Sequence, residues 1–202
     1  MFGSNIILNI RFVRFLVSLG MTLMLLTVVT NVLAFDSSLP NNKFGIHLAV
    51  PQQEDIQKAS ELVNSSGGKW GYVTLVIEEK DRDKGKWQEI FNQLRKLHLI
   101  PIVRLATVPE GAVWKKPIKE DAESWASFLD SLRWPVKDQY VVLFNEPNHV
   151  TEWGGVVDAE DYAKVSEAFA TKLNEKNGNF FIMLAGFDAS APSGSSTEDE
   201  GT

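Results

Sequence analysis

The feature that most constrains the fold is an alternation of short apolar runs with segments of helical periodicity, which extends from residue 44 to residue 184. The apolar runs have the length and the β-branched and aromatic content of buried strands. Strands that alternate with helices are typical of a parallel sheet with crossover connections. The expected strands are residues 44–50, 72–77, 100–106, 140–145 and 180–184.

Four helices are expected between these five strands, which makes the predicted class α/β. Ser and Gly residues at 65–68 end the first helix, and Pro135 prevents the third from running on. Asp158 is a good N-cap for the fourth helix. Trp87 and Trp125 fall on the apolar faces of the second and third helices, so we expect both in the core.

Residues 1–34 are predicted to be a targeting segment. Arg11 and Arg14 precede an uncharged, mostly aliphatic stretch at 15–35, and small residues at 32–34 suit a signal peptidase. The uncharged stretch also reaches the ~20 residues that cross a bilayer. A cleaved signal peptide and a retained membrane anchor both remain open, and either one places the rest of the chain outside the cytoplasm, secreted or anchored.

The remainder divides into a linker at 35–43, a folded domain at 44–192 and a tail at 193–202. The tail is small, polar and acidic, and we expect it to be disordered. The chain has no cysteine, which excludes disulfides, thiolate catalysis and zinc-thiolate sites. Its formal charge is -6 and no basic stripe stands out, so nucleic acid is not an expected partner.

The motif Asn145-Glu146-Pro147-Asn148 ends the fourth predicted strand. A carboxylate fixed where a parallel strand ends lies where α/β barrels keep their catalytic groups. Glu146 is therefore a candidate catalytic acid. A solvated acid at a strand-to-loop junction is the simpler alternative.

A strand that ends in Asn-Glu-Pro within a βα series resembles the clan A glycoside hydrolases, which are retaining enzymes. The resemblance is closest to cellulase-like and family 39-like members, in which Asn-Glu-Pro-Asn closes the fourth strand. Glu146 also falls on the fourth strand here. The resemblance covers residues 44–192, thinly outside the motif, and implies a TIM (β/α)8 barrel that hydrolyses O-glycosyl bonds of a polysaccharide or β-glycoside. It implies a carbohydrate substrate and no cofactor.

The same resemblance implies roles for the motif. Glu146 would protonate the departing sugar oxygen and later act as the base, while a second carboxylate about 5–5.5 Å away attacks the anomeric carbon. Asn145 would donate a hydrogen bond to the sugar 2-hydroxyl. Pro147 would fix the turn away from the strand.

Further candidate substrate-binding residues surround the motif. Trp153 could stack on a sugar ring or could simply cover the barrel rim. Asn148 and His149 could line the substrate cleft, although a loop histidine is more often solvated. His47, on the first strand, is expected to be a core histidine.

Arg104, near the end of the third strand, is a further substrate-site candidate. A guanidinium is costly to bury without a partner, so we expect an ion pair with a carboxylate, either Glu78 or Glu146. The sequence contains no cluster of metal ligands, and no metal site is predicted.

The chain departs from the family in its number of strands. A (β/α)8 barrel has eight strands and typically ~250 residues, whereas the predicted strands stop at the fifth. The family's nucleophile is a Glu on the seventh strand, so no residue here takes that role. The sequence predicts a barrel truncated after its fifth strand, with the acid but without the nucleophile.

Three interpretations remain. The chain is the N-terminal portion of a glycosidase, or it is a partial barrel that binds glycans without cleaving them or completes itself by association through its open sheet edges. Alternatively, the five strands form an open flavodoxin-like binding module. Strand order separates these interpretations, because a flavodoxin-like sheet places the first strand between the second and third.

Overall fold

The computed structural model describes residues 42–201. The predictions for the targeting segment and for most of the linker fall on residues 1–41 and lie outside the described residues. All described elements belong to one compact unit, Ala34–Thr202. No helix within the described part is long and apolar enough to cross a bilayer.

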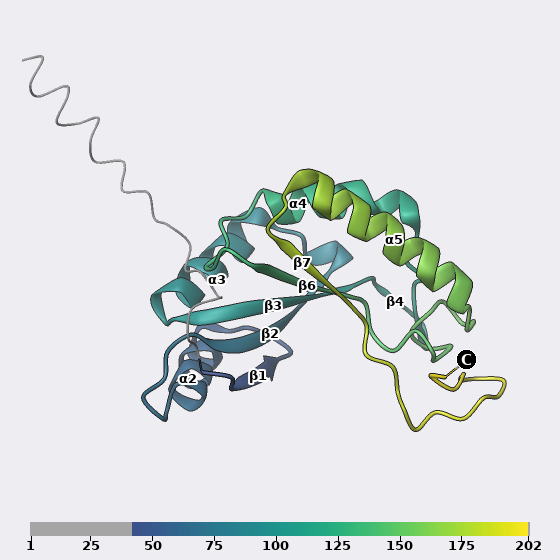
Figure 1. The fold of residues 1–202 in the computed structure, drawn as a ribbon, viewed down its shortest axis with the longest axis horizontal. Coiled ribbons are helices and arrows are strands. Elements are labelled where there is room, and N and C mark those ends of the chain that lie inside the picture. The colour runs from purple at the N-terminus through teal and green to yellow at the C-terminus, as the bar shows by residue number, and fades with distance from the viewer. Residues whose placement is uncertain (1–41, 202) are drawn as a thin grey trace, which may run out of the picture. The chain divides into compact units, whose positions relative to one another are not determined.

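The centre of this unit is a five-stranded parallel sheet in the order β1-β2-β3-β6-β7 (Figure 1). The order follows the chain, so the flavodoxin-like alternative is wrong. The prediction of an α/β fold with five parallel strands is confirmed. The strands are β1 (Gly45–Leu48), β2 (Gly71–Glu78), β3 (Leu99–Ala106), β6 (Gln139–Leu143) and β7 (Phe180–Leu184).

Four α-helices connect successive strands, as predicted, within the described residues. The carboxylate of Asp158 accepts a hydrogen bond from the Asp161 N–H at 2.9 Å and caps the last helix as expected. Asp83 caps α3 in the same way through the Lys86 N–H, at 2.8 Å. The helices are α2 (Gln53–Val63), α3 (Lys84–Lys96), α4 (Ala122–Asp130) and α5 (Ala159–Lys176).

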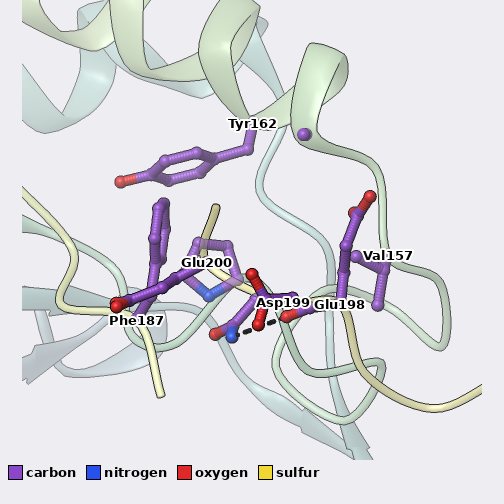
Figure 2. A pocket seen from close by; sticks show the side chains of 9 residues that line it. Val157, Tyr162, Phe187, Glu198, Asp199 and Glu200 are labelled. Atoms are coloured by element: carbon purple, nitrogen blue, oxygen red, sulfur yellow. Dashed lines mark hydrogen bonds between the residues drawn. The ribbon is translucent and has the colours of Figure 1, made fainter. Parts of the chain in front are cut away.

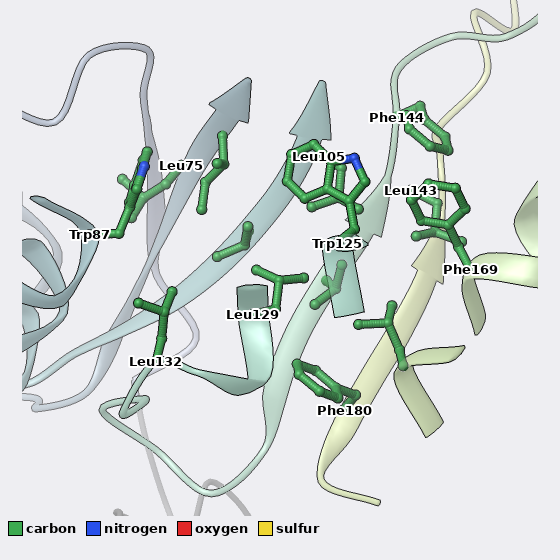
Figure 3. Packing of buried hydrophobic residues seen from close by; sticks show 14 of the residues in the cluster. Leu75, Trp87, Leu105, Trp125, Leu129, Leu132, Leu143, Phe144, Phe169 and Phe180 are labelled. Atoms are coloured by element: carbon green, nitrogen blue, oxygen red, sulfur yellow. The ribbon is translucent and has the colours of Figure 1, made fainter. Parts of the chain in front are cut away.

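One face of the sheet and the apolar faces of the four helices form a single hydrophobic cluster. Strand β2 shows the alternation that produces it, because Val73, Leu75 and Ile77 are fully buried while their neighbours on the other face are half-buried. Trp87 and Trp125 lie inside this cluster, which confirms both core predictions (Figure 3). The sheet is therefore anchored to its helices through one face.

The two edge strands are less well covered. On β7, Phe181 is 55% exposed and Leu184 is 61% exposed. His47 on β1 is also exposed, so the prediction of a core histidine is wrong. The physical reason is that β1 pairs only with β2 within the described sheet, which leaves the other side of the strand open.

The loop after β3 contains a short hairpin that the sequence did not predict. Strands β4 (Pro109–Glu110) and β5 (Val113–Trp114) pair antiparallel around Gly111, whose φ is +67°. Glycine adopts this left-handed conformation without steric cost. Strands of two residues are too short to show a periodic pattern in sequence.

The structure describes the acidic tail as far as residue 201 and pairs it with the loop after β6, whereas its composition predicts disorder. The Val150 N–H donates to the Ser196 carbonyl and the Glu198 N–H donates to the Asn148 carbonyl, both at 3.0 Å. A β-bridge joins His149 to Thr197. Backbone pairing with the loop after β6 fixes the tail, and backbone pairing leaves no trace in amino-acid composition.

Core burial gives the first testable prediction. Leu94 of α3 is fully buried and Leu62 of α2 is 61% exposed. Leu94→Ala should lower the free energy of unfolding by about 2–5 kcal/mol, because it removes buried methylenes and leaves a cavity. Leu62→Ala should change it by about 0.5 kcal/mol or less. Urea denaturation of the unit Ala34–Thr202 measures both, and equal effects would contradict the assigned packing.

Candidate functional site at the carboxyl edge of the sheet

The candidate site lies where the carboxyl ends of the parallel strands meet. Five connections leave this edge, namely residues 49–52 after β1, 79–83 after β2, 107–121 after β3, 144–158 after β6 and 185–201 after β7. In parallel sheets flanked by helices, ligands bind at this edge because the loops there can vary without disturbing the core.

The motif Asn145-Glu146 lies in an unusual stretch of backbone. Phe144 has a φ of 72° and Glu146 a φ of 30°, both in the left-handed region that non-glycine residues rarely adopt. The turn at Phe144 ends β6 at Leu143, two residues before the predicted end. It also directs the Phe144 ring into the core, where it packs edge-on against Phe169 at 5.1 Å between ring centroids.

Asn145 is thereby placed at a small cavity of ≈ 20 Å³ at this edge. Arg104 and Thr107 from β3 and its loop share the lining with Trp114 and Glu152. A cavity of this size holds about one water molecule. A sugar ring would therefore have to lie on the open side of these residues.

Arg104 is the cation among the residues that line this cavity, and two nearby carboxylates interact with its charge. Burial lowers the pKa of its guanidinium, and the carboxylates of Glu152 and Glu146 partly offset that effect. The predicted ion pair does not form, since Arg104 reaches neither Glu78 nor Glu146 within 4.0 Å in the described residues, and Glu78 pairs with Lys80 at 3.0 Å. Glu152 is the site carboxylate that sequence reasoning misses, because a single acid in a loop belongs to no pattern.

Glu146 itself is half-buried. Its backbone carbonyl accepts a hydrogen bond from the His149 N–H at 2.9 Å, which closes the turn after the strand. Within residues 42–201 no hydrogen bond or ion pair engages its carboxylate. The carboxylate of Glu146 is close enough to raise the pKa of Arg104 through its charge, but it makes no direct contact with the guanidinium.

Trp153 does not form a sugar platform. It is 0% exposed, its ring packs against Phe144 and Tyr162, and its Nε1–H donates to Asp161 Oδ2 at 3.1 Å. The alternative role, in which it covers the rim of the sheet, fits this position. Burial raises the pKa of Asp161, but hydrogen bonds from Lys116 and Trp153 outweigh that effect and leave the pKa lowered.

Asn148 and His149 contact the C-terminal segment rather than a substrate cleft. Asn148 is buried, and its Nδ2 donates to the carbonyls of Asp188 and Glu198 at 3.1 and 3.0 Å. Its Oδ1 accepts from the Asp188 N–H at 3.2 Å. His149 Nε2 lies 3.0 Å from Asp188 Oδ2. The Asn148 amide is thus fully engaged by the C-terminal segment, and His149 is paired with Asp188 rather than merely solvated; substrate binding by either residue stays a prediction.

A second cavity, of ≈ 70 Å³, lies beneath the C-terminal segment (Figure 2). Tyr162 at the start of α5 and Phe187 form its aromatic wall, with rings in edge contact at 5.9 Å. Glu198, Asp199 and Glu200 supply its acidic side. Sequence reasoning misses this cavity because the tail was expected to be disordered.

The loops at this edge are fastened to each other. Lys115 pairs with Glu79 at 3.0 Å, and this hydrogen bond raises the pKa of Lys115. The Trp114 N–H donates to the Thr151 carbonyl at 2.7 Å, and the Gly154 N–H donates to the Trp114 carbonyl at 3.0 Å. The loops after β2, β3 and β6 therefore form a connected rim around Asn145 and Glu146.

In the described residues, no group of three or more His, Cys, Asp or Glu side chains could hold a metal ion. No protein-family model matches the chain, and no curated protein matches it.

The contacts of Asn148 generate the second prediction. Asn148→Ala should lower the free energy of unfolding by about 1–3 kcal/mol, because it leaves buried polar groups of the C-terminal segment without a partner. Amide hydrogen exchange should become faster at Val150 and Glu198, whose N–H groups bond across this contact. Asn174→Ala, on the exposed side of α5, is the matched control. Unchanged exchange at both amides would show that Asn148 does not hold the segment.

Proposed function

We propose that the carboxyl edge of this sheet is the carbohydrate site of a retaining O-glycosyl hydrolase that acts on a polysaccharide or β-glycoside outside the cytoplasm. The observation that carries the proposal is the position of Asn145 and Glu146. They lie two and three residues beyond the end of β6, the fourth strand of a parallel sheet whose strand order follows the chain. The resemblance of the motif to clan A glycosidases requires this position.

Glu146 is the acid/base in this proposal. Its carboxyl group would transfer a proton to the oxygen of the departing sugar and later take a proton from the attacking water. Its carboxylate has no partner among the described residues, which suits a group that must reach a substrate oxygen. Asn145 and Arg104 carry hydrogen-bond donors beside it, and these are suited to sugar hydroxyls.

Retaining hydrolysis also needs a second carboxyl group, which forms the covalent bond to the anomeric carbon. The family that the motif resembles carries this group on its seventh strand, and the described sheet has five strands, so no residue among 42–201 takes the role. A second candidate function follows from that assignment. A sheet that has the acid and the hydroxyl-binding groups but no nucleophile would bind glycans without cleaving them.

Sugar binding tests the location of the site. A series of β-linked gluco-, xylo- and manno-oligosaccharides added to isotope-labelled Ala34–Thr202 should shift the amide signals of Arg104, Asn145 and Glu146. The expected Kd is about 1 mM or weaker, since only part of a barrel contributes contacts. Asn145→Ala should weaken binding while Asn174→Ala does not, and the protein should release no leaving group from aryl β-glycosides. Signal shifts confined to other regions would refute the location of the site. Clear turnover would refute the claim that no residue among 42–201 acts as the nucleophile.

The acid/base role requires a barrel that also carries the nucleophile. In a protein in which three further βα units close this sheet, Glu146→Gln should lower kcat by roughly 10²–10⁴-fold on an aryl β-glycoside. The loss should be smaller for a dinitrophenyl leaving group, which departs without protonation. Glu167→Gln, on the exposed side of α5, serves as the control. Full activity of the Glu146→Gln variant would show that another group donates the proton.

A further inference from the structure

The two edge strands of the sheet lack the features that normally prevent pairing. Edge strands in soluble proteins usually carry charged residues, prolines or bulges. Strand β1 has the sequence GIHL and β7 has FFIML, with no Lys, Arg, Asp, Glu or Pro in either. Among residues 42–201, no further strand pairs with the outer side of β1 or of β7.

The hydrogen-bonding groups that face outward on β7 follow from its register. The Gln139 N–H donates to the Asn179 carbonyl at 2.9 Å, and Gln139 lies opposite Phe180. In a parallel ladder a residue bonds to the two neighbours of its register partner, so alternate residues of β7 face β6. The N–H and C=O groups of Ile182 and Leu184 consequently point to the free edge.

The outward-facing backbone groups of β1 also follow from its register. The Tyr72 N–H donates to the Phe44 carbonyl at 2.8 Å, and Tyr72 lies opposite Gly45. The even-numbered residues of β1 thus face β2. The backbone groups of Gly45 and His47 point to the free edge, and both residues are exposed.

Exposed apolar side chains gather at these edges. Eight large hydrophobic residues are exposed in the described part of the chain, and five of them lie on the two edge strands or within three residues of them. These five are Phe44, Val50, Phe181, Leu184 and Phe187. Covering them would remove apolar surface from water at the same time as the backbone groups find partners.

We propose that β7 of one chain pairs in parallel with β1 of a second copy, and that the reverse pair forms across a two-fold axis parallel to the strands. Such an axis preserves strand direction, so both contacts are parallel. The two contacts pair the outward-facing N–H and C=O groups of β1 and β7 in both copies. They close the assembly as a dimer whose strands form a ten-stranded ring. This inference rests on the fold and not on the proposed function.

The closed ring would also cover the face of the sheet that is turned away from the helices. Its interior would be lined by that face, which carries the exposed ring of Phe181 and the partly buried Met183. Ten strands enclose a wider interior than the eight that side chains alone can fill, which leaves room at the mouth. The carboxyl edges of both copies would lie at the same end, so each copy would supply the wall that the other lacks.

The mass of the unit Ala34–Thr202 in solution, measured by light scattering after size-exclusion chromatography, tests the proposal. This unit contains the whole described core and excludes the apolar leader. We expect twice the mass of a single chain. Leu184→Lys should weaken dimerisation by roughly tenfold or more, because it places a charge in the paired edge. Leu62→Lys is the matched control, since Leu62 is also 61% exposed but lies on α2; circular dichroism checks that both variants are folded.

Cysteine crosslinking tests which edges meet. The chain has no cysteine, so introduced thiols react without background. A short bis-maleimide should crosslink the double variant His47→Cys/Leu184→Cys into dimers, whereas Leu184→Cys alone should remain uncrosslinked. A monomer at all concentrations, a dimer insensitive to Leu184→Lys, or efficient crosslinking through Leu184→Cys alone would each overturn the proposal.

Discussion

The structure depends on the burial of one face of a parallel sheet against four helices. The strands supply fully buried aliphatic side chains and the helices supply large rings such as Trp87, Trp125 and Phe169, all in one cluster. Burial of apolar area is the main favourable contribution to such a fold. The cluster stabilises the sheet through one face only. The strand ends and the opposite face are therefore not part of this core.

The packing of the core sets the backbone path at the carboxyl edge of the sheet. The left-handed turn at Phe144 places one ring in the cluster and leaves the next two residues, Asn145 and Glu146, at the rim. The core contact and the position of the candidate acid are therefore consequences of the same backbone turn. Arg104 on the neighbouring strand adds a positive charge, which interacts with the carboxylates of Glu152 and Glu146.

The sequence was sufficient for the periodic elements and insufficient for the loops. All five strands and four helices, and the cap at Asp158, follow from patterns that repeat over several residues. The roles of Trp153, Asn148 and the tail depend on contacts between segments distant in the chain, such as Asn148 with Asp188 and Glu198. A tryptophan in a glycine-rich loop has the same local sequence whether it faces solvent or core, so only the packing of α5 decides its role.

The first turn of α5 joins segments that are far apart in the sequence. Asp161 holds Lys116 from one connection and Trp153 from another, and the Tyr162 hydroxyl accepts the Ala185 N–H at 2.8 Å just beyond β7. Insertions or deletions that shift this turn would displace three connections together. Natural variation in a lineage carrying this scaffold should accordingly concentrate at the tip of the β4–β5 hairpin, where a change in length disturbs no second segment.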